Sequence, residues 1–316
     1  MICSQNDVKF YENFRLTNFN TLKIKADAKL FILPDNDGEF VGTIKKYSKQ
    51  NPVILGNGSN ILFSSGGIER TVIYSGNLDR ISLSGSKLEV QAGVKVQTLS
   101  KYAYEHSFYG FEFLIGIPAT LGGAVYMNAG AHNQTISDNL ITAKVYDYEN
   151  LKTINLSKED LDFSYRHSVL SQKPYALINA TFELSKGDKN EIKSKMDENI
   201  IFRKNRQPNL ALPNAGSVFK NPPNCEYSAG ALIDMAGFRG YSIGDCEVWQ
   251  NHCNFIVNKG NATSFDYTNL VYEIYCKVQE KFNIKLKPEI VYISNDTIEG
   301  SEKLKEEKEK WKIMKN

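Results

Sequence analysis

Two glycine-rich segments carry the residue types that could hold a phosphate-bearing ligand. The first, Gly56-Asn57-Gly58-Ser59-Asn60, follows a short apolar run. Glycine lets a ligand approach the main chain closely and adopts positive φ without strain, so this turn could present consecutive amide groups to an anion. Isoleucine follows at position 61 and opens another β-type run, which disfavours a dinucleotide turn that leads into a helix. The sequence therefore predicts an anion-binding turn between two strands, and a tight hairpin without a ligand is the alternative.

Small residues dominate a second segment, residues 116–131, which also offers the hydrogen-bonding side chains of Thr120 and Asn128. Main-chain amides without bulky neighbours would let a flat ligand or a pyrophosphate lie directly on the backbone. Close packing of a helix on a sheet would explain the same composition without a ligand. The residues predicted to line a ligand site are Gly116, Ile117, Pro118, Ala119, Thr120, Gly122, Gly123, Ala124, Asn128, Ala129, Gly130 and Ala131.

Three side chains elsewhere stand out as chemical groups, namely Arg166, Ser217 and Glu289. Taken singly, each has an ordinary structural explanation: a surface or ion-pair group, a turn residue after glycine, and a solvent-facing residue of a strand. The Gly-x-Ser-x-Gly pattern of a hydrolase nucleophile does not surround Ser217. Residue types alone therefore leave the role of all three open.

Apolar periodicity and chain breakers predict the elements that would position these groups. The prolines and asparagines of residues 207–215 predict a domain boundary. Ser264 is predicted to cap a helix with one apolar stripe, and the charge-rich tail beyond Asn295 to form a solvated helix. The other predictions are strands at 29–34, 52–56, 60–63, 71–75, 141–149, 151–157, 175–185, 255–257 and 287–293, a hairpin around Gly85, and helices at 39–49, 96–103, 187–206 and 229–236.

The composition is that of an ordinary globular protein. The chain has 316 residues, 41% of them hydrophobic and 23% charged, and its net charge of +2 gives no electrostatic reason to bind nucleic acid. Five cysteines form no C-x-x-C pair and fit no zinc finger, so we expect no metal and a reducing compartment. The sequence shows no signal peptide and no run approaching the roughly 20 apolar residues of a membrane span. We therefore expect a cytoplasmic protein without a membrane partner.

Taken together, these segments resemble one family, the UDP-N-acetylenolpyruvoylglucosamine reductases, which are flavoproteins of peptidoglycan precursor synthesis. The resemblance runs from about residue 20 to residue 293, and the short span between Tyr165 and Ser217 is similar to the shorter subtype of the family. Its markers are Gly-Asn-Gly-Ser-Asn at 56–60, Gly-Ile-Pro and Gly-Gly-Ala within 116–124, Met-Asn-Ala-Gly-Ala at 127–131, Tyr165-Arg166-x-Ser168, Gln207-Pro208, Ala-Gly-Ser-Val-Phe-Lys-Asn-Pro at 215–222, His252-x-Asn254-Phe255-Ile256-Val257-Asn258 and Pro288-Glu289.

The resemblance implies an α+β fold of the PCMH or vanillyl-alcohol-oxidase type, in which two subdomains hold FAD non-covalently and a smaller α+β domain binds a UDP-sugar. In this chain these parts would be residues 1–78, 79–206 and 207–294, followed by a charged tail at 295–316. It also implies that NADPH is the reductant and that the enolpyruvyl ether of UDP-N-acetylglucosamine is reduced to UDP-N-acetylmuramate. The oligomeric state stays open.

The same resemblance implies roles for single residues. Arg166 would stabilise negative charge on the substrate, Ser217 would protonate a carbon atom, and Glu289 would assist at this site. The residues that would bind the substrate are Lys220, Asn221, Arg206 and His252.

Four features depart from the family pattern: the absence of a glycine pair from residues 23–27, Ala119, the Ser64-Ser65 pair and Trp249. Two alternatives therefore stay open beside the reductase. One is a flavin oxidase that acts on a hydroxy acid or a sugar, and the other is a non-catalytic paralogue that binds flavin or a nucleotide.

Overall fold

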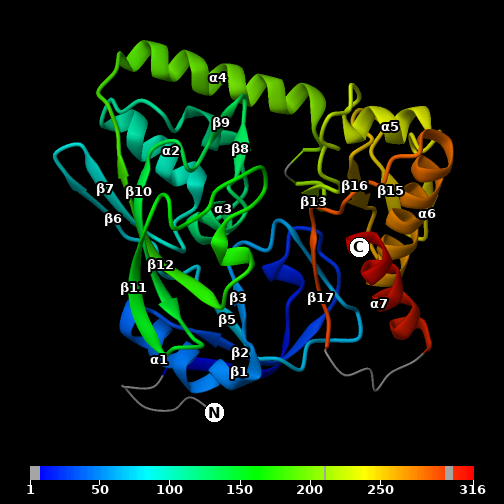
Figure 1. Cartoon of the computed structure of the whole chain (residues 1–316), viewed down its shortest axis with the longest axis horizontal. Coiled ribbons are helices and arrows are strands. Elements are labelled where there is room, and N and C mark those ends of the chain that lie inside the picture. Colours follow the sequence, from blue (N-terminus) through cyan, green and yellow to red (C-terminus); the bar gives the residue numbers. More distant parts are fainter. Residues whose placement is uncertain (1–7, 210, 296–301) are drawn as a thin grey trace. The chain divides into compact units, whose positions relative to one another are not determined.

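The computed structural model describes residues 8–209, 211–295 and 302–316. Contacts between residues divide the chain into two units, each built from separate segments (Figure 1). Unit 1 comprises Met1–Glu12, Leu30–Asn57 and Arg70–Arg203, and unit 2 comprises Asn13–Lys29, Gly58–Glu69 and Lys204–Asn316. The division into domains at residues 78, 206 and 294 stays a prediction.

One sheet has the strand order β1-β2-β5-β3, and its strands β3 and β5 are short and rich in β-branched residues. Strands β2 and β3 both pair in parallel with β5, because the chain returns between them through helix α1 and loops. The helix buries Phe40 and Ile44 against Ile73 of β5. This packing agrees with the helix predicted at 39–49 and the strand predicted at 71–75. The bounds are β1 Lys9–Arg15, β2 Asp27–Leu33, α1 Asp37–Tyr47, β3 Val53–Leu55 and β5 Val72–Tyr74.

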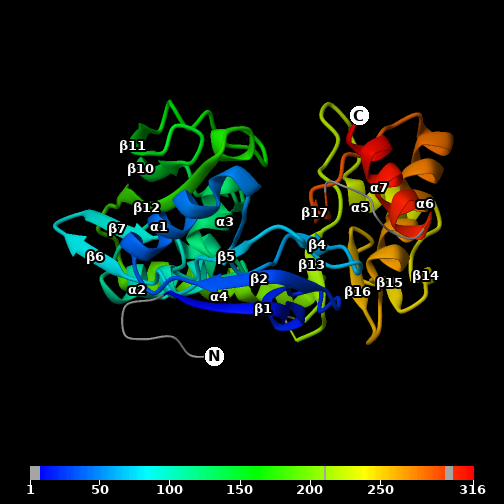
Figure 2. The same ribbon diagram turned by 90° about the horizontal axis from the view of Figure 1, so that it is seen from below.

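The second sheet of unit 1 is antiparallel, with the order β11-β10-β12-β7-β6, and Figure 2 shows β10, β11 and β12 side by side. The predicted hairpin turns at Gly85, which has φ +63°. Helices α2 and α3 supply apolar residues to the core of this sheet. The bounds are β6 Ile81–Ser84, β7 Lys87–Gln91, α2 Val96–Glu105, α3 Leu121–Tyr126, β8 Gly130–Ala131, β9 Gln134–Thr135, β10 Leu140–Asp147, β11 Lys152–Ser157, β12 Tyr175–Glu183 and α4 Lys189–Arg206.

Unit 2 contains a sheet with the order β13-β16-β15-β14 and a separate parallel pair, β17 with β4. Its core joins residues of helix α6, such as Leu270 and Ile274, to Ile256 of β16. The bounds are β4 Ile61–Phe63, β13 Asn214–Ser217, α5 Ala229–Met235, β14 Ser242–Ile243, β15 Cys246–Val248, β16 Phe255–Asn258, α6 Ser264–Phe282, β17 Val291–Ile293 and α7 Glu302–Lys315. Within the described ranges, no helix combines the length and the apolar character needed to cross a membrane.

Two predictions about unit 2 need correction. The N-cap of α6 is Thr263, which forms a reciprocal capping box with Asp266, so Ser264 is already the first helical residue. The charged tail does form a helix, but it is not a solvated appendage. Helix α7 buries Trp311 and Met314 in the core of unit 2, because these residues share one face of an otherwise charged helix.

Candidate active site

The two glycine-rich segments are held together within unit 1. Gly56 follows β3, and a Cβ atom at this position would overlap the hydroxyl group of Thr120. The side-chain amide of the next residue, Asn57, donates a hydrogen bond to the carbonyl oxygen of Pro118 (2.6 Å). Only glycine fits at position 56, so the start of the first turn lies against the second segment.

Two buried polar atoms in this part of unit 1 have no hydrogen-bond partner among the described residues. They are the hydroxyl of Thr120, in a residue 3% exposed, and the side-chain oxygen of Asn128, in a residue 6% exposed. Asn128 is fixed, because its amide nitrogen donates to the carbonyl oxygen of Ser164 (3.0 Å) and its φ is +43°. Buried polar groups are rarely left unpaired, so both atoms fit a site whose ligand supplies the missing partners. A flavin with polar ring edges and hydroxyl groups meets that requirement.

Packing explains some of the small residues and not others. The amide groups of Leu121 and Gly122 donate to the carbonyl oxygens of Val94 and Ala92 (both 2.8 Å), and a Cβ atom at Gly122 would lie 3.3 Å from the latter. At Gly123, which is exposed, a Cβ atom would meet only the Thr120 hydroxyl, at 3.8 Å. Close packing therefore accounts for Gly122, while Gly123 keeps the space beside Thr120 open.

Arg166 lies at the tip of a two-residue turn that Ser164 and His167 close as an antiparallel bridge. Its φ is +54°, a left-handed conformation in which turns usually place glycine or asparagine. The guanidinium lies 5.1 Å from the centre of the Tyr165 ring and donates to the carbonyl oxygen of Gly130 (3.3 Å). Such local strain is typical of functional positions and fixes the direction of the side chain.

The second half of the first turn, Gly58 to Asn60, belongs to unit 2. Gly58 has φ +61°, and a Cβ atom there would overlap the carbonyl oxygen of Phe19. Strands β3 and β4 on either side of the turn belong to different sheets, so the hairpin alternative is wrong. Each half of the turn is pinned within its own unit.

Unit 2 brings Ser217 and Glu289 onto adjacent segments. Ser217 is the last residue of β13. The carbonyl oxygen of the next residue, Val218, accepts a hydrogen bond from the main-chain amide of Glu289 (2.8 Å). The side-chain amide of Asn60 donates to the carbonyl oxygen of Glu289 (3.0 Å), and its own carbonyl accepts from the amide of Val291 (2.9 Å). Asn60, Ser217 and Glu289 therefore form one local arrangement, although 229 residues separate the first from the last.

Asn254 is a positioning residue to which the sequence analysis gave no role. Its side chain accepts from the amide of Phe219 (2.9 Å) and donates to the carbonyl oxygen of the same residue (2.8 Å), while its own carbonyl accepts from the amide of Val218 (2.8 Å). Asn254 is 4% exposed, and its three hydrogen bonds satisfy main-chain groups of the segment after Ser217, as a neighbouring β-strand would. The sequence feature that could have pointed to this residue is an asparagine directly before the apolar run of β16.

The four residues predicted to bind substrate all belong to unit 2. Asn221 accepts a hydrogen bond from the amide of Ala229, the first residue of α5 (3.0 Å), and the amide of Lys220 donates to the carbonyl oxygen of Lys287 (2.9 Å). Burial lowers the pKa of His252, and the nearby positive charge of Arg206 lowers this pKa further. The ring atom Nδ1 of His252 accepts from the amide of Asn254 (3.3 Å), so in the neutral form the proton is on Nε2.

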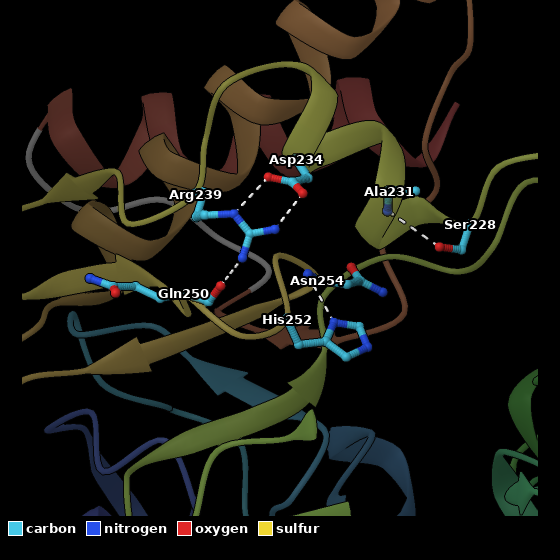
Figure 3. Close-up of polar contacts among 7 residues, drawn as sticks. All are labelled: Ser228, Ala231, Asp234, Arg239, Gln250, His252 and Asn254. Atoms are coloured by element: carbon cyan, nitrogen blue, oxygen red, sulfur yellow. Dashed lines mark hydrogen bonds and ion pairs between the residues drawn. The ribbon is translucent and has the colours of Figure 1, made fainter. Parts of the chain in front are cut away.

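An exposed ion pair fixes the loop that carries this histidine (Figure 3). Arg239 donates through Nε to Asp234 of α5 (2.9 Å) and through a second nitrogen to the carbonyl oxygen of Gln250. Ser228, which caps α5 through the amide of Ala231, fixes the start of the same helix. The loop is therefore held both at Gln250 and at His252. In the part of the chain that the structure describes, no group of three His, Cys, Asp or Glu side chains is placed to hold a metal ion.

Family models match two parts of the chain. Residues 28–156 match an FAD-binding domain, and residues 207–293 match the C-terminal domain of UDP-N-acetylenolpyruvoylglucosamine reductase. A crystal structure of UDP-N-acetylenolpyruvylglucosamine reductase (MurB) from Thermus caldophilus aligns with a TM-score of 0.77 and 31% identity, over 91% of this chain and 99% of that one. Fold and site together define an α+β flavoenzyme with an FAD-binding domain and a separate C-terminal domain.

Curated relatives give the same family. The UDP-N-acetylenolpyruvoylglucosamine reductase of Caldanaerobacter subterraneus is 40% identical over 285 residues, or 89% of this chain and 93% of the relative. That of Clostridium novyi is 38% identical over 299 residues, or 94% and 95%. The chain belongs to the UDP-N-acetylenolpyruvoylglucosamine reductase family. The predicted family, the fold class and the FAD cofactor are confirmed, and the roles of single site residues stay predictions.

Proposed function

We propose that this protein reduces UDP-N-acetylglucosamine enolpyruvate to UDP-N-acetylmuramate with NADPH, in peptidoglycan precursor synthesis. The observation that carries the proposal is identity of 38–40% to curated reductases over about nine tenths of both chains. Four described cysteines, Cys225, Cys246, Cys253 and Cys276, are free thiols, which supports a place in the reducing cytoplasm.

Residues of the two glycine-rich segments would hold the cofactor. Thr120 and Asn128 would pair their unpartnered oxygens with it, and the missing side chain at Gly123 would leave room for it. When bound, FAD supplies a hydride, taken from NADPH, to the carbon–carbon double bond of the enolpyruvyl ether. The remaining tasks, which are charge stabilisation and proton transfer, fall to side chains of this chain.

Hydride addition to the terminal carbon of the enol ether leaves negative charge on the neighbouring carbon and on the attached carboxylate. We propose that Arg166 holds this charge, because a planar guanidinium can donate two parallel hydrogen bonds to a carboxylate. One well-placed donor of this kind is typically worth about 3 kcal/mol of barrier. The hydrogen bond from the Arg166 guanidinium to the carbonyl oxygen of Gly130, within the second glycine-rich segment, supports the assignment because it directs the guanidinium towards the predicted cofactor residues.

The carbanionic carbon must then receive a proton, and Ser217 is the proposed donor. A hydroxyl is a weak acid in water, but the charged substrate carbon is strongly basic, so transfer over hydrogen-bonding distance is feasible. Glu289 would orient or polarise this serine, a role that the hydrogen bond between the adjacent main chains of the two segments supports. Lys220 and Asn221 would contact the substrate, and Arg206 with the Nε2 group of His252 would bind its diphosphate.

The test is NADPH oxidation by the purified FAD-loaded protein, measured with and without the enolpyruvyl nucleotide. We expect oxidation that depends on the nucleotide and gives one UDP-N-acetylmuramate for each NADPH consumed. A protein that takes up no FAD, or that instead consumes oxygen with a hydroxy acid or a sugar, would contradict the proposal.

A further inference from the structure

Helix α7 carries a carboxyl group that the proposed chemistry does not use. Glu307 is 1% exposed, and its Oε2 atom accepts a hydrogen bond from the hydroxyl of Ser264 (3.0 Å). The Tyr292 hydroxyl also hydrogen-bonds this carboxyl group, whereas Oε1 has no partner among the described residues. Burial raises the pKa of Glu307, which means that its charged form destabilises the folded chain. The other glutamates of α7 are all exposed, so the cost of burying Glu307 suggests that this carboxyl group has a specific role.

The contacts of Glu307 join three separate segments of unit 2. Ser264 is the first residue of α6, and it exchanges two hydrogen bonds with Ser65: Ser264 N to Ser65 Oγ (2.9 Å) and Ser65 N to Ser264 Oγ (2.8 Å). Tyr292 lies in β17, and its hydroxyl also hydrogen-bonds Ser64, directly after β4. One carboxyl group thus ties the start of α6 to the ends of β4 and β17.

The opposite ends of these two strands lie at the candidate active site. Strands β4 and β17 pair in parallel, with Tyr292 opposite Leu62. At the start of this pair, the side-chain amide of Asn60 donates to the carbonyl oxygen of Glu289, and the carbonyl oxygen of Asn60 accepts from the amide of Val291. Only two residues, Ile290 and Val291, separate Glu289 from the tyrosine that contacts Glu307. A shift of β17 along β4 would therefore move Glu289 relative to Asn60.

The rest of α7 is built to hold Glu307 in place. Trp311 stacks on Tyr292, with ring centroids 5.4 Å apart and planes at 8°, and its indole N–H donates to the hydroxyl of Thr268 (2.7 Å). Leu304 packs on Gly66, where a Cβ atom would lie 2.7 Å from a methyl group of the leucine. These contacts fix both ends of the helix against α6 and the segment after β4.

We propose that Glu307 is a positioning residue for the reduction step, acting through Tyr292 to fix the register of β17 against β4 and so the place of Glu289. The inference rests on the proposed role of Glu289. It assigns to α7, which lies beyond the matched C-terminal domain at residues 207–293, a part in catalysis without contact to the substrate. In its charged form the carboxyl group accepts these hydroxyl donors through charge-assisted hydrogen bonds, which are about twice as strong as those that the neutral amide oxygen of a glutamine would accept.

The test compares Glu307→Gln with Glu309→Gln, an exposed position on the same helix. We expect Glu307→Gln to bind FAD, to accept electrons from NADPH at the parental rate and to melt no earlier than the parental protein. Its kcat for the enolpyruvyl nucleotide should fall about tenfold, since small displacements of catalytic groups have effects of this size or more. Glu309→Gln should match the parental protein in all four measurements.

A double-mutant cycle tests the route through Tyr292. Tyr292→Phe should lower the same kcat, and adding Glu307→Gln should lower it little further, because both changes break one contact. The positioning role would be overturned if Glu307→Gln kept the parental kcat, or if the two substitutions lowered kcat additively. It would also be overturned if the loss of kcat followed a loss of FAD content and a lower melting temperature. A parental protein that does not reduce the nucleotide would overturn the proposed function itself, and the positioning role with it.

Discussion

The main-chain amide of Glu289 donates a hydrogen bond to the carbonyl oxygen of Val218, at 2.8 Å. This bond sets the strand that ends in Ser217 beside the segment that carries Glu289. It is continued by the bridge between Phe219 and Pro288 and is secured by Asn60 and Asn254. The relative placement of these two predicted catalytic residues is thus a property of the main chain of unit 2.

Replacing Ser217 with alanine should separate the two halves of the reaction. Reduction of the bound flavin by NADPH should continue at the parental rate, because no proton from Ser217 enters that step. Turnover of the enolpyruvyl nucleotide should fall by about a hundred- to ten-thousandfold, the usual range for loss of a general acid. Stopped-flow absorbance of the flavin measures both steps in one experiment.

The control for this change is Ser242→Ala, at an exposed position of β14. It should leave both steps unchanged. Nucleotide turnover at the parental rate in Ser217→Ala would show that another group donates the proton.

Thr120→Val should affect the free and the flavin-bound protein in opposite directions. Valine keeps the shape of threonine but removes a buried hydroxyl that has no partner among the described residues, so the apoprotein should melt at the same or a higher temperature. If FAD supplies that partner, its Kd should rise about tenfold, which corresponds to about 1.4 kcal/mol. Thermal unfolding of the apoprotein and titration with FAD give the two values.

Thr153→Val is the matched control, because Thr153 is exposed on β11. It should leave FAD affinity unchanged. Equal affinities in Thr120→Val and the parental protein would place the cofactor away from this hydroxyl.

Gly56→Ala and Gly42→Ala should have opposite effects on the free energy of unfolding. The added methyl group at Gly56 would overlap the Thr120 hydroxyl, so the variant should lose about 1–3 kcal/mol and bind FAD more weakly. At Gly42, inside α1, a Cβ atom meets nothing within 4 Å, so alanine should add up to about 1 kcal/mol through helix propensity. Urea unfolding of the two apoproteins measures both changes, and equal destabilisation would be evidence against close contact at Gly56.

Protonation of His252 should destabilise the protein in mild acid. Burial lowers the pKa of this histidine below its ordinary value of 6.5, so the unfolded chain takes up the proton more readily than the folded chain. The stabilising contribution is present above about pH 6.5 and is lost as the pH falls towards the lower pKa of the folded state. Melting temperatures at pH 7.5, 6.5 and 5.5 should therefore decline more steeply for the parental protein than for His252→Gln. Parallel declines would mean that His252 titrates alike in both states.

Local patterns predicted most elements of the fold. The spacing of Phe40 and Ile44 marked α1, the turn at Gly85 marked the β6–β7 hairpin, and the proline after Gln207 marked the end of α4. Each of these signals acts within a few residues, where backbone geometry and side-chain periodicity decide the structure. The resemblance to a family, and not periodicity, gave the cofactor and the reaction.

Long-range pairings left no local signal. Nothing near Asn60 indicates that its side chain holds Glu289, and the overlap that excludes a side chain at Gly56 depends on Thr120, far along the chain. Helix α7 differs from these pairings, because its sequence does contain a spacing that predicts a buried face, although the many charged residues obscure it. Glu307, Trp311 and Met314 follow the i, i+4, i+7 spacing of a buried face, and the glutamate at the first position made that face look polar.

The discontinuous make-up of unit 2 has a consequence for biosynthesis. Its core needs Leu22 and Leu62 from the beginning of the chain together with Trp311 and Met314 of α7. While the ribosome is still adding residues, the early segments have no finished partner, whereas every segment of unit 1 has been made by Arg203. Unit 1 can therefore fold during translation, whereas the unit that carries Ser217 and Glu289 cannot complete its core until α7 has been synthesised.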